Sequence, residues 1–246
     1  MSNNYPRCLH KAPIVEFVWE VRFSSELTNI SEVLPGLLYS KLRPSHVSKL
    51  PHANLPPEVL LQDPNLRYIP TVRLDWEVPY IIQLGEHVIS LNGQRPYSSW
   101  SDFKGKIEKV VQLLKEIDLI KEKEIERFSI KYINVLSSKN HAEFPLNAQL
   151  KLGEHNLTQQ TFHVRTDLRE GDFLQIIQVI SPLKAELGTE TLEGTLIDID
   201  TIYDTKGSRD FLKRSSELLD DAHELNKKTF FDFLTENSLS ELEPEY

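Results

Sequence analysis

Apolar and polar residues alternate along several stretches of this chain. A period of two residues predicts β-strands, because successive side chains of a strand point to opposite faces. The clearest case is a half-buried strand at 14–23, whose apolar face carries Val15, Phe17, Trp19, Val21 and Phe23. Further strands are predicted at 71–78, 80–84, 87–91, 126–136, 148–152, 160–166, 172–181 and 193–203. Short turns rather than helices separate the strands after 147, which predicts antiparallel pairing.

Apolar residues at helical spacing predict two helices in the first half of the chain. The stronger pattern lies at about 99–118, where Ser99 is placed to cap the helix and Asp102 follows three residues later. A shorter helix is expected to begin with Ser31 as its cap, and Pro35 is tolerable only in its first turn. Both helices present an apolar stripe that must be buried.

The remaining segments divide into a long helix, a tail and a connection. The last helix is expected to begin near Ser208 and to face a core through Leu218, Leu219 and Ala222. The acidic tail at 241–245 is expected to fray. Six prolines in 43–70 predict a long connection without regular structure.

The order of these elements predicts an α+β fold made of two sequential β-then-α halves. Residues 1–144 give the order β-α-β-β-β-α-β, and residues 145–246 give antiparallel strands followed by a long helix. Because amphipathic helices bury their apolar stripe against a sheet, we expect antiparallel sheets covered on one face by long helices.

Charge is distributed unevenly between the two predicted halves. The net charge of the 246 residues is −9. Residues 145–246 hold 10 Lys and Arg against 20 Asp and Glu, whereas residues 1–144 are nearly balanced. General nucleic-acid binding is disfavoured, since that affinity comes largely from basic residues. The acidic half is either a solvated surface or a landing face for a basic protein partner.

Two features predict a cytoplasmic protein that does not span a membrane. The apolar runs are far shorter than the roughly 20 residues that a spanning helix needs. The first eight residues lack the apolar segment of a secretory signal, and the single cysteine cannot form an internal disulfide.

Local motifs of the common enzyme classes are missing from the sequence. It contains no Walker phosphate loop, no G-x-G-x-x-G, no G-x-S-x-G elbow and no H-E-x-x-H. One cysteine also excludes a thiolate zinc site within the chain. No cofactor is predicted, and the balance is against an enzyme.

Two groups of titratable residues are nevertheless candidates for catalysis or metal binding. Asp198 and Asp200 share one face of a predicted strand and are suited to hold Mg²⁺ or to act as an acid and a base. His223 lies on the last helix with Asp220 and Glu224 at helical spacing. The favoured alternative is ordinary pairing of all these residues with Lys or Arg on the surface.

Binding residues are suggested at two other places. Arg95 and Ser99 flank the expected start of a helix, where free backbone N–H groups suit an anion, although a capped turn explains them equally. Tyr68 on the proline-rich connection is a candidate anchor for a protein partner, together with Asp220 and Glu224.

Seven segments, spread in order over most of the chain, resemble a sporadically distributed prokaryotic family of uncharacterised proteins of about 250 residues that carries a numbered label and no assigned activity. They are 11–23, 34–38, 88–100, 126–134, 197–200, 222–226 and 230–235. The residues that match the pattern individually are Gly36, Arg127, Asn134, Asp200 and His223. The patchy distribution of that family implies carriage with antiviral defence and toxin–antitoxin genes, and it implies no catalytic role for any of these residues.

Together these observations favour a non-catalytic cytoplasmic binding or regulatory protein, acting as an accessory subunit or neutralising partner in a prokaryotic defence or toxin–antitoxin operon. Two alternatives stay open. One is a metal-assisted hydrolase or nuclease that uses Asp198, Asp200 and His223. The other is a sensor of a small ligand, with a pocket between sheet and helices.

Overall fold

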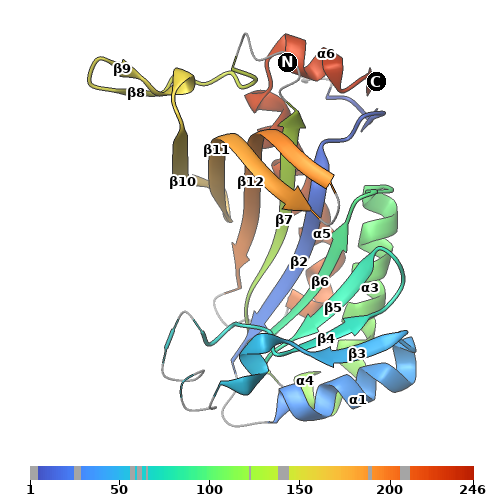
Figure 1. Ribbon diagram of the computed structural model, residues 1–246. Coiled ribbons are helices and arrows are strands. Elements are labelled where there is room, and N and C mark those ends of the chain that lie inside the picture. The colour runs from blue at the N-terminus through green and yellow to red at the C-terminus, as the bar shows by residue number, and fades with distance from the viewer. Residues whose placement is uncertain are drawn as a thin grey trace.

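Strands from both halves of the sequence join into one nine-stranded antiparallel sheet in the computed structural model (Figure 1). The structure describes residues 5–24, 29–55, 59, 63–64, 66–121, 123–137, 144–187, 190–205 and 211–246. In spatial order the strands of the sheet are β10 (Phe162–Glu170), β11 (Phe173–Leu187), β12 (Glu190–Asp204), β7 (Ile125–Ser137), β2 (Ile14–Phe23), β6 (Val88–Gln94), β5 (Tyr80–Leu84), β4 (Val72–Asp75) and β3 (His46–Lys49).

The remaining elements are helices, two short 3-10 turns and two small sheets. The helices are α1 (Ile30–Leu42), α3 (Trp100–Glu116), α4 (Asp118–Lys121), α5 (Phe211–Phe233) and α6 (Glu236–Glu241), with 3-10 turns η1 (Pro51–Asn54) and η2 (Leu157–Gln159). Two strand pairs lie apart from the large sheet: β1 (Cys8–Leu9) with β13 (Pro244–Glu245), and β8 (Lys151–Leu152) with β9 (His155–Asn156). Among the described residues, no helix combines the length and apolar composition needed to cross a bilayer.

The two faces of the large sheet differ in chemistry, as the alternation in β2 predicts. Phe17, Trp19, Val21 and Phe23 are at most 2% exposed. They join a core that includes buried residues of α1, α3 and α5, so we call this side the helix face. The opposite side of β2, β7 and β12 carries charged residues, and we call it the charged face: Glu16, Glu20, Arg22, Arg127, Lys131, Asp198 and Asp200.

The predicted fold of antiparallel sheets covered by long helices, in two sequential halves, is wrong. β12 of the second half pairs with β7 of the first half, so the later strands extend the same sheet. Of the described residues, 42% lie in strands and 32% in helices. The helices pack on parts of the sheet, with α5 on β7 and β12 and α1 on β4 and β5. Strand pairing therefore governs this α+β fold, because it joins segments from both halves of the sequence.

Local expectations fail where backbone pairing or an outside residue overrides the local pattern. Within the proline-rich connection, β3 forms the edge of the sheet by pairing with β4. Ser31 does not cap α1; instead, the backbone N–H groups of Ile30 and Ser31 donate to the Glu86 carboxylate at 3.1 and 3.0 Å. With this external cap, α1 continues through Pro35, which lies beyond the first turn.

The acidic tail is ordered against the N-terminal segment rather than frayed. Cys8 and Leu9 of β1 pair with the backbone of β13. The Lys11 ammonium lies 2.8 Å from the Glu243 carboxylate, and Arg7 pairs with Glu245. Basic residues near one end thus complement the acidic residues near the other. Ser208, the predicted start of the last helix, lies outside the described residues.

One glycine allows the β11–β12 hairpin to meet β7. Gly194 of β12 has φ +154°, and it pairs with Ser137 of β7. A Cβ atom at this position would overlap the carbonyl oxygen of Leu136. Only glycine fits both the dihedral angle and the close approach.

Candidate functional site

A cavity of about 220 Å³ lies between the sheet and α5. Its walls come from β7, α5, the loop before α3 and the N-terminal segment before β2, and we call it the sheet–helix cavity. Most of the lining is apolar or aromatic and includes Leu9, Pro13, Ile14, Trp100, Phe230 and Phe231. Small-molecule sites have this character: an apolar wall with a few convergent polar groups.

Three of the polar groups form a hydrogen-bonded series in the cavity wall. The Tyr97 and Tyr132 hydroxyl oxygens lie 3.2 Å apart, and the Tyr132 hydroxyl lies 3.3 Å from His223 Nδ1. These residues come from the loop before α3, from β7 and from α5. The series therefore joins three separate elements around one space.

Trp100 fixes the position of the His223 ring. The two rings are stacked with centroids 4.1 Å apart and planes 4° from parallel. Ser99 Oγ accepts a hydrogen bond from the Asp102 backbone N–H at 3.1 Å, which is the predicted cap and sets the start of α3. Trp100 Nε1–H then donates to Asp220 Oδ1 of α5 at 3.0 Å. The cap and this bond both hold Trp100 in place, so the ring against which His223 stacks is fixed.

The polar groups of this series are uncharged at neutral pH. Burial lowers the pKa of His223 to about 4, and the neighbouring positive charge of Lys227 lowers it further in the same direction. Burial raises the pKa of Tyr97 to about 12 and holds the pKa of Tyr132 well above its usual range. A ligand in the cavity thus meets neutral hydrogen-bonding groups, with Lys227 as a nearby cation.

Asn134 is a polar residue of the cavity wall whose side chain bonds to no other described group. It is 2% exposed, lines the cavity, and its carboxamide makes no hydrogen bond within the described part of the chain. Asn226, another buried polar residue of the helix face, is paired, because its Nδ2 donates to the Ile199 carbonyl at 2.9 Å and to Thr201 Oγ1 at 3.0 Å. This amide is therefore available to a ligand that enters the cavity.

Asn134 is not among the site residues predicted from the sequence, where it only matches the resembled family, although a signal was available. The inward positions of its strand are Phe128, Ile130 and Tyr132, which are all buried and lie two residues apart. Continuing the two-residue period puts Asn134 on the same apolar face. A carboxamide at a position that the pattern assigns to the core marks a special site.

The nucleophilic groups beside the cavity are not activated for catalysis. Ser98 Oγ donates to Asp102 Oδ2 at 2.7 Å, and Ser99 Oγ serves the helix cap. The hydrogen bond from Cys8 to Glu245 raises the pKa of the Cys8 thiol, which disfavours the thiolate. This arrangement favours binding over covalent chemistry.

Asp198 and Asp200 lie on the opposite side of the sheet from His223. They share a face of β12, as predicted, but Ile199 between them pairs with Tyr132, whose hydroxyl reaches His223. Side chains at neighbouring positions of a strand point to opposite faces. The cluster on which the hydrolase alternative depends is therefore not assembled.

Basic side chains of the charged face occupy the space around the two aspartates. Asp198 is 7% exposed, lies 3.4 Å from Lys131 Nζ and accepts a hydrogen bond from Gln178 Nε2 at 3.1 Å. Asp200 lies 4.0 Å from Arg127, and burial raises its pKa. Pairing with Lys and Arg is the favoured interpretation, and both aspartates have a basic neighbour, but Asp198 is buried and Asp200 is half-buried rather than exposed. Within the described ranges, no three His, Cys, Asp or Glu residues gather as metal ligands do.

The remaining candidates fall in different places. Arg95 lines a separate cavity near α6, so it does not converge with Ser99 on an anion. Asp220 is engaged by Trp100 and by Lys104 at 2.7 Å, whereas Glu224 is exposed on α5. Tyr68 is half-buried and donates to Glu126 Oε2 at 2.5 Å, which makes it part of a folded loop rather than an exposed anchor.

Comparison with known proteins adds no relative: no family model and no curated protein sequence matches the chain. The resemblance to the sporadically distributed family stays a prediction. The geometry of the chain itself thus carries the functional argument.

Proposed function

We propose that this chain is a binding protein that holds a small planar molecule in the sheet–helix cavity. The observation that carries the proposal is the Asn134 carboxamide, which is buried, faces the cavity and has no partner among the described residues. The neutral series of Tyr97, Tyr132 and His223 supplies further hydrogen-bonding groups beside it.

The lining defines the ligand by its chemistry. The apolar and aromatic walls favour a molecule with a flat apolar body. A carboxamide offers one donor and one acceptor side by side, so it pairs best with a primary amide or a similar planar group. Because His223, Tyr97 and Tyr132 are neutral, the ligand is uncharged at the end that contacts them.

Benzamide is a suitable probe because it combines a flat ring with a primary amide. We expect benzamide added to ¹⁵N-labelled protein to shift the indole N–H signal of Trp100, which lines the cavity. Trp19 and Trp76 are core residues outside the cavity lining, and their indole signals serve as internal controls. Equal shifts of all three signals, or none, would contradict the proposal.

Two variants sharpen this experiment. Asn134→Leu removes the carboxamide while keeping a similar volume, and it should weaken benzamide binding about tenfold. The matched control is Asn92→Leu, because Asn92 lies on β6 and donates to Ser90 Oγ away from the cavity. Unchanged binding in Asn134→Leu would remove the role assigned to this residue.

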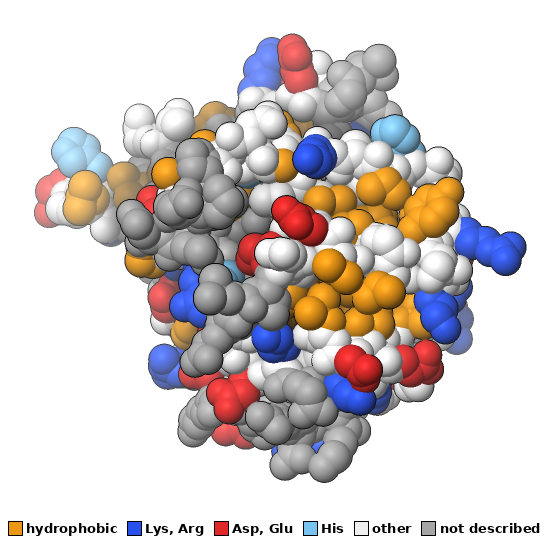
Figure 2. All heavy atoms as spheres, turned by 90° about the horizontal axis from the view of Figure 1, so that it is seen from below, with side chains coloured by type: hydrophobic (Ala, Val, Ile, Leu, Met, Phe, Trp, Pro, Cys, Tyr) orange, Lys and Arg blue, Asp and Glu red, His pale blue; other side chains and the backbone are white. Residues whose placement is uncertain are grey.

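A second candidate function is the one that the sequence favours: a cytoplasmic accessory subunit or neutralising partner that binds a protein. An exposed apolar surface supports it. Figure 2 views the molecule from the end of α1 and α4 and shows apolar side chains gathered there between charged ones. The residues include Val33 at 49% and Leu37 at 41% exposure, and Leu37, Leu113, Ile117 and Leu119 line a groove.

Co-purification with the products of neighbouring genes tests this second function. We expect one of these products to bind at a fixed ratio, and the double variant Val33→Asp and Leu37→Asp to abolish binding. Leu168→Asp is the control, because Leu168 is equally exposed but lies on β10, in the second half of the sequence. Recovery of the same protein from the double variant would move the interface elsewhere, and recovery of none from wild type would contradict the function.

A further inference from the structure

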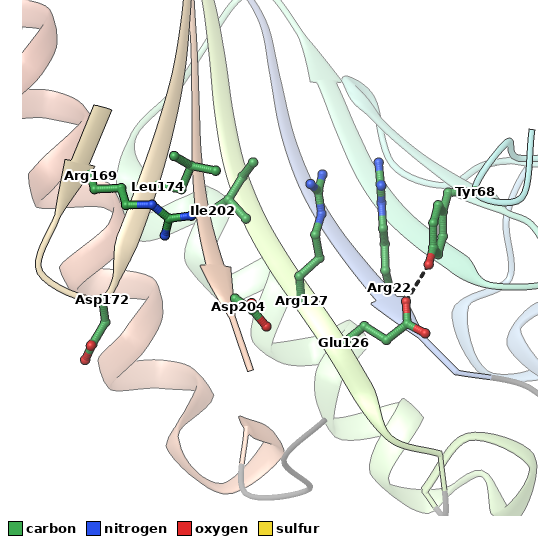
Figure 3. A pocket seen from close by; sticks show the side chains of 9 residues that line it. All are labelled: Arg22, Tyr68, Glu126, Arg127, Arg169, Asp172, Leu174, Ile202 and Asp204. Carbon is green, nitrogen blue, oxygen red and sulfur yellow. Dashed lines mark hydrogen bonds between the residues drawn. The ribbon is translucent and has the colours of Figure 1, made fainter. Parts of the chain in front are cut away.

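A second cavity, of about 300 Å³, opens at one end of the charged face. Figure 3 shows that arginines from three strands border it: Arg22 of β2, Arg127 of β7 and Arg169 of β10. Leu174 and Ile202 contribute apolar surface, and Tyr68 closes one side. We call this space the arginine cavity.

Strand register brings the arginines together. Arg22 and Arg127 are direct partners across the β2–β7 pair. Arg169 is opposite Leu174, which is opposite Ile202, so these three continue the same side of the sheet towards its edge. The three arginines are far apart in the sequence. β2 and β7 are neighbours, whereas β10 is the edge strand beyond β11 and β12, whose Leu174 and Ile202 lie between Arg169 and the other two arginines.

Three arginines line this cavity together with three carboxylates, those of Glu126, Asp172 and Asp204, but two of the guanidinium groups keep donors without a partner among the described residues. Glu20 Oε1 accepts from both Arg22 Nε at 2.7 Å and Arg127 Nη2 at 3.2 Å. Arg127 Nε is buried and has no hydrogen-bond partner. Arg169 forms no ion pair within the described part of the chain. Glu20 thus already bridges the opposed Arg22 and Arg127, and Asp200 lies 4.0 Å from Arg127, so an added anion uses the remaining guanidinium donors.

Tyr68 holds Arg22 in place for such a role. The Arg22 guanidinium lies over the Tyr68 ring, 4.3 Å from its centroid. The Tyr68 hydroxyl donates to Glu126 Oε2, as the dashed line in Figure 3 marks, and Glu126 Oε1 is 3.5 Å from Arg67. A stacked guanidinium keeps its edge for hydrogen bonds to a planar acceptor.

We propose that the arginine cavity binds a small organic oxyanion, a phosphate or carboxylate group attached to an apolar body. Arg22, Arg127 and Arg169 bind the anionic group, since guanidinium pairs with both oxyanions in a bidentate manner. Leu174 and Ile202 contact the apolar body. Asp172 and Asp204 also border the cavity, and their negative charge disfavours a polyanion such as a nucleic acid.

This site is independent of the sheet–helix cavity. Arg22 and Arg127 lie on the charged face, whereas Tyr132 and Asn134 point to the helix face of the same sheet. The chemistry also differs, because three arginines line the arginine cavity, whereas Tyr97, Tyr132, His223 and Asn134 offer neutral hydrogen-bonding groups in the other. Failure of one proposal leaves the other standing.

Calorimetric titration with phenyl phosphate at low salt tests the proposal. We expect saturable binding of phenyl phosphate and none of phenol, which has the same ring without the anion. Benzoate and inorganic phosphate are the two further arms: binding of benzoate assigns the site to carboxylates as well, and binding of inorganic phosphate as tight as that of phenyl phosphate assigns it to the free ion. Absence of binding by all three anions would overturn the proposal.

Variants locate the site. Arg169→Gln and Arg127→Gln should each weaken phenyl phosphate binding about tenfold, because each removes a charge-assisted hydrogen bond. Arg165→Gln is the matched control: Arg165 lies on the same face of β10, pairs with Asp167 at 3.6 Å and does not border the cavity. Arg169 is exposed, so its replacement leaves the fold intact even where Arg127→Gln lowers stability. Equal weakening by all three variants would show diffuse attraction and contradict the site.

Discussion

The two faces of the large sheet place opposite chemistry on the same strands. On the helix face, β2 buries Phe17 and Trp19 completely, and Tyr132 of β7 is neutral. One position away, on the charged face, the same two strands carry Arg22 and Arg127, which both donate hydrogen bonds to Glu20. Successive side chains of a strand lie on opposite faces of the sheet. A residue in this protein therefore contacts groups of its own face and not those of its neighbours in sequence.

The comparison also separates two kinds of candidate site. The sheet–helix cavity joins a strand, a helix and a loop, and its hydrogen-bonded series of Tyr97, Tyr132 and His223 is uncharged. The arginine cavity joins three strands through their register, and its polar groups are charged. The two proposals therefore call for different ligands.

Core truncation on β2 should show the largest difference between the faces. Phe17 is fully buried and packs edge-on against Tyr97 and Phe103, with centroids 4.8 Å apart. Phe17→Ala should lower the free energy of unfolding by about 3–5 kcal/mol through lost burial and a residual cavity. Val18→Ala, on the charged face, should cost roughly 1 kcal/mol. Urea unfolding measures both, and similar losses would mean that the two faces are equally packed.

Protonation of His223 should be the next largest effect. Its pKa is about 4 in the folded chain and 6.5 in the unfolded chain, so between these values the unfolded chain takes up a proton that the folded chain excludes. The free energy of unfolding therefore falls as the pH drops from 6.5 to 4, by up to about 3 kcal/mol. The contribution is constant above and below this window.

The His223→Gln variant isolates this contribution. Stability of the variant should change less with pH between 6.5 and 4 than stability of wild type, as measured by urea unfolding at several pH values. The control variant is His87→Gln. Burial also lowers the pKa of His87, but this residue lies outside the sheet–helix cavity. Parallel pH profiles for wild type and His223→Gln would show that the imidazole is not held neutral by its surroundings.

The ion pairs of the charged face should contribute less. Lys131→Met leaves the buried carboxylate of Asp198 with only Gln178 as a polar contact. We expect a loss of about 1–2 kcal/mol, below the value for a fully buried pair because 31% of the Lys131 side chain is exposed. Adding Asp198→Asn should restore most of the lost stability.

The control variant is Lys184→Met, which breaks an exposed pair with Glu193 and should have no measurable effect on the free energy of unfolding. Equal losses in the two lysine variants would contradict burial of the charged face.

The pattern of apolar and polar residues predicts those features of the fold that depend on residues close together in the sequence. It placed the apolar side of β2 and the Ser99 cap of α3 correctly, because alternation and capping depend on neighbours in sequence. It missed β3, whose sequence His-Val-Ser-Lys shows no apolar alternation and which forms by pairing at the sheet edge. The ordered tail was missed for the same reason, since its partner β1 lies at the other end of the chain.

The candidate site was predicted in part for a related reason. The sequence points to His223 as a candidate residue, but it suggests Asp198, Asp200 and Asp220 as the partners of this histidine. The contacts that matter, with Tyr132 and Trp100, depend on which strand lies beneath α5. No spacing rule gives the neighbour of β12, so the arginine cavity was equally hidden. Pairing order is a property of the whole sheet.

The smallest expected effect gives the sharpest view of the helix face, because it separates a residue kept for the fold from one kept for a ligand. Asn226→Leu removes donors to Ile199 and Thr201 and should cost roughly 2 kcal/mol. Asn134→Leu removes an amide without a partner and should be neutral or raise the free energy of unfolding by about 1 kcal/mol. Urea unfolding of the two variants compares them directly. A loss in Asn134→Leu as large as in Asn226→Leu would make Asn134 a structural residue, whereas a gain combined with weaker benzamide binding means that the protein retains a destabilising amide for the molecule it binds.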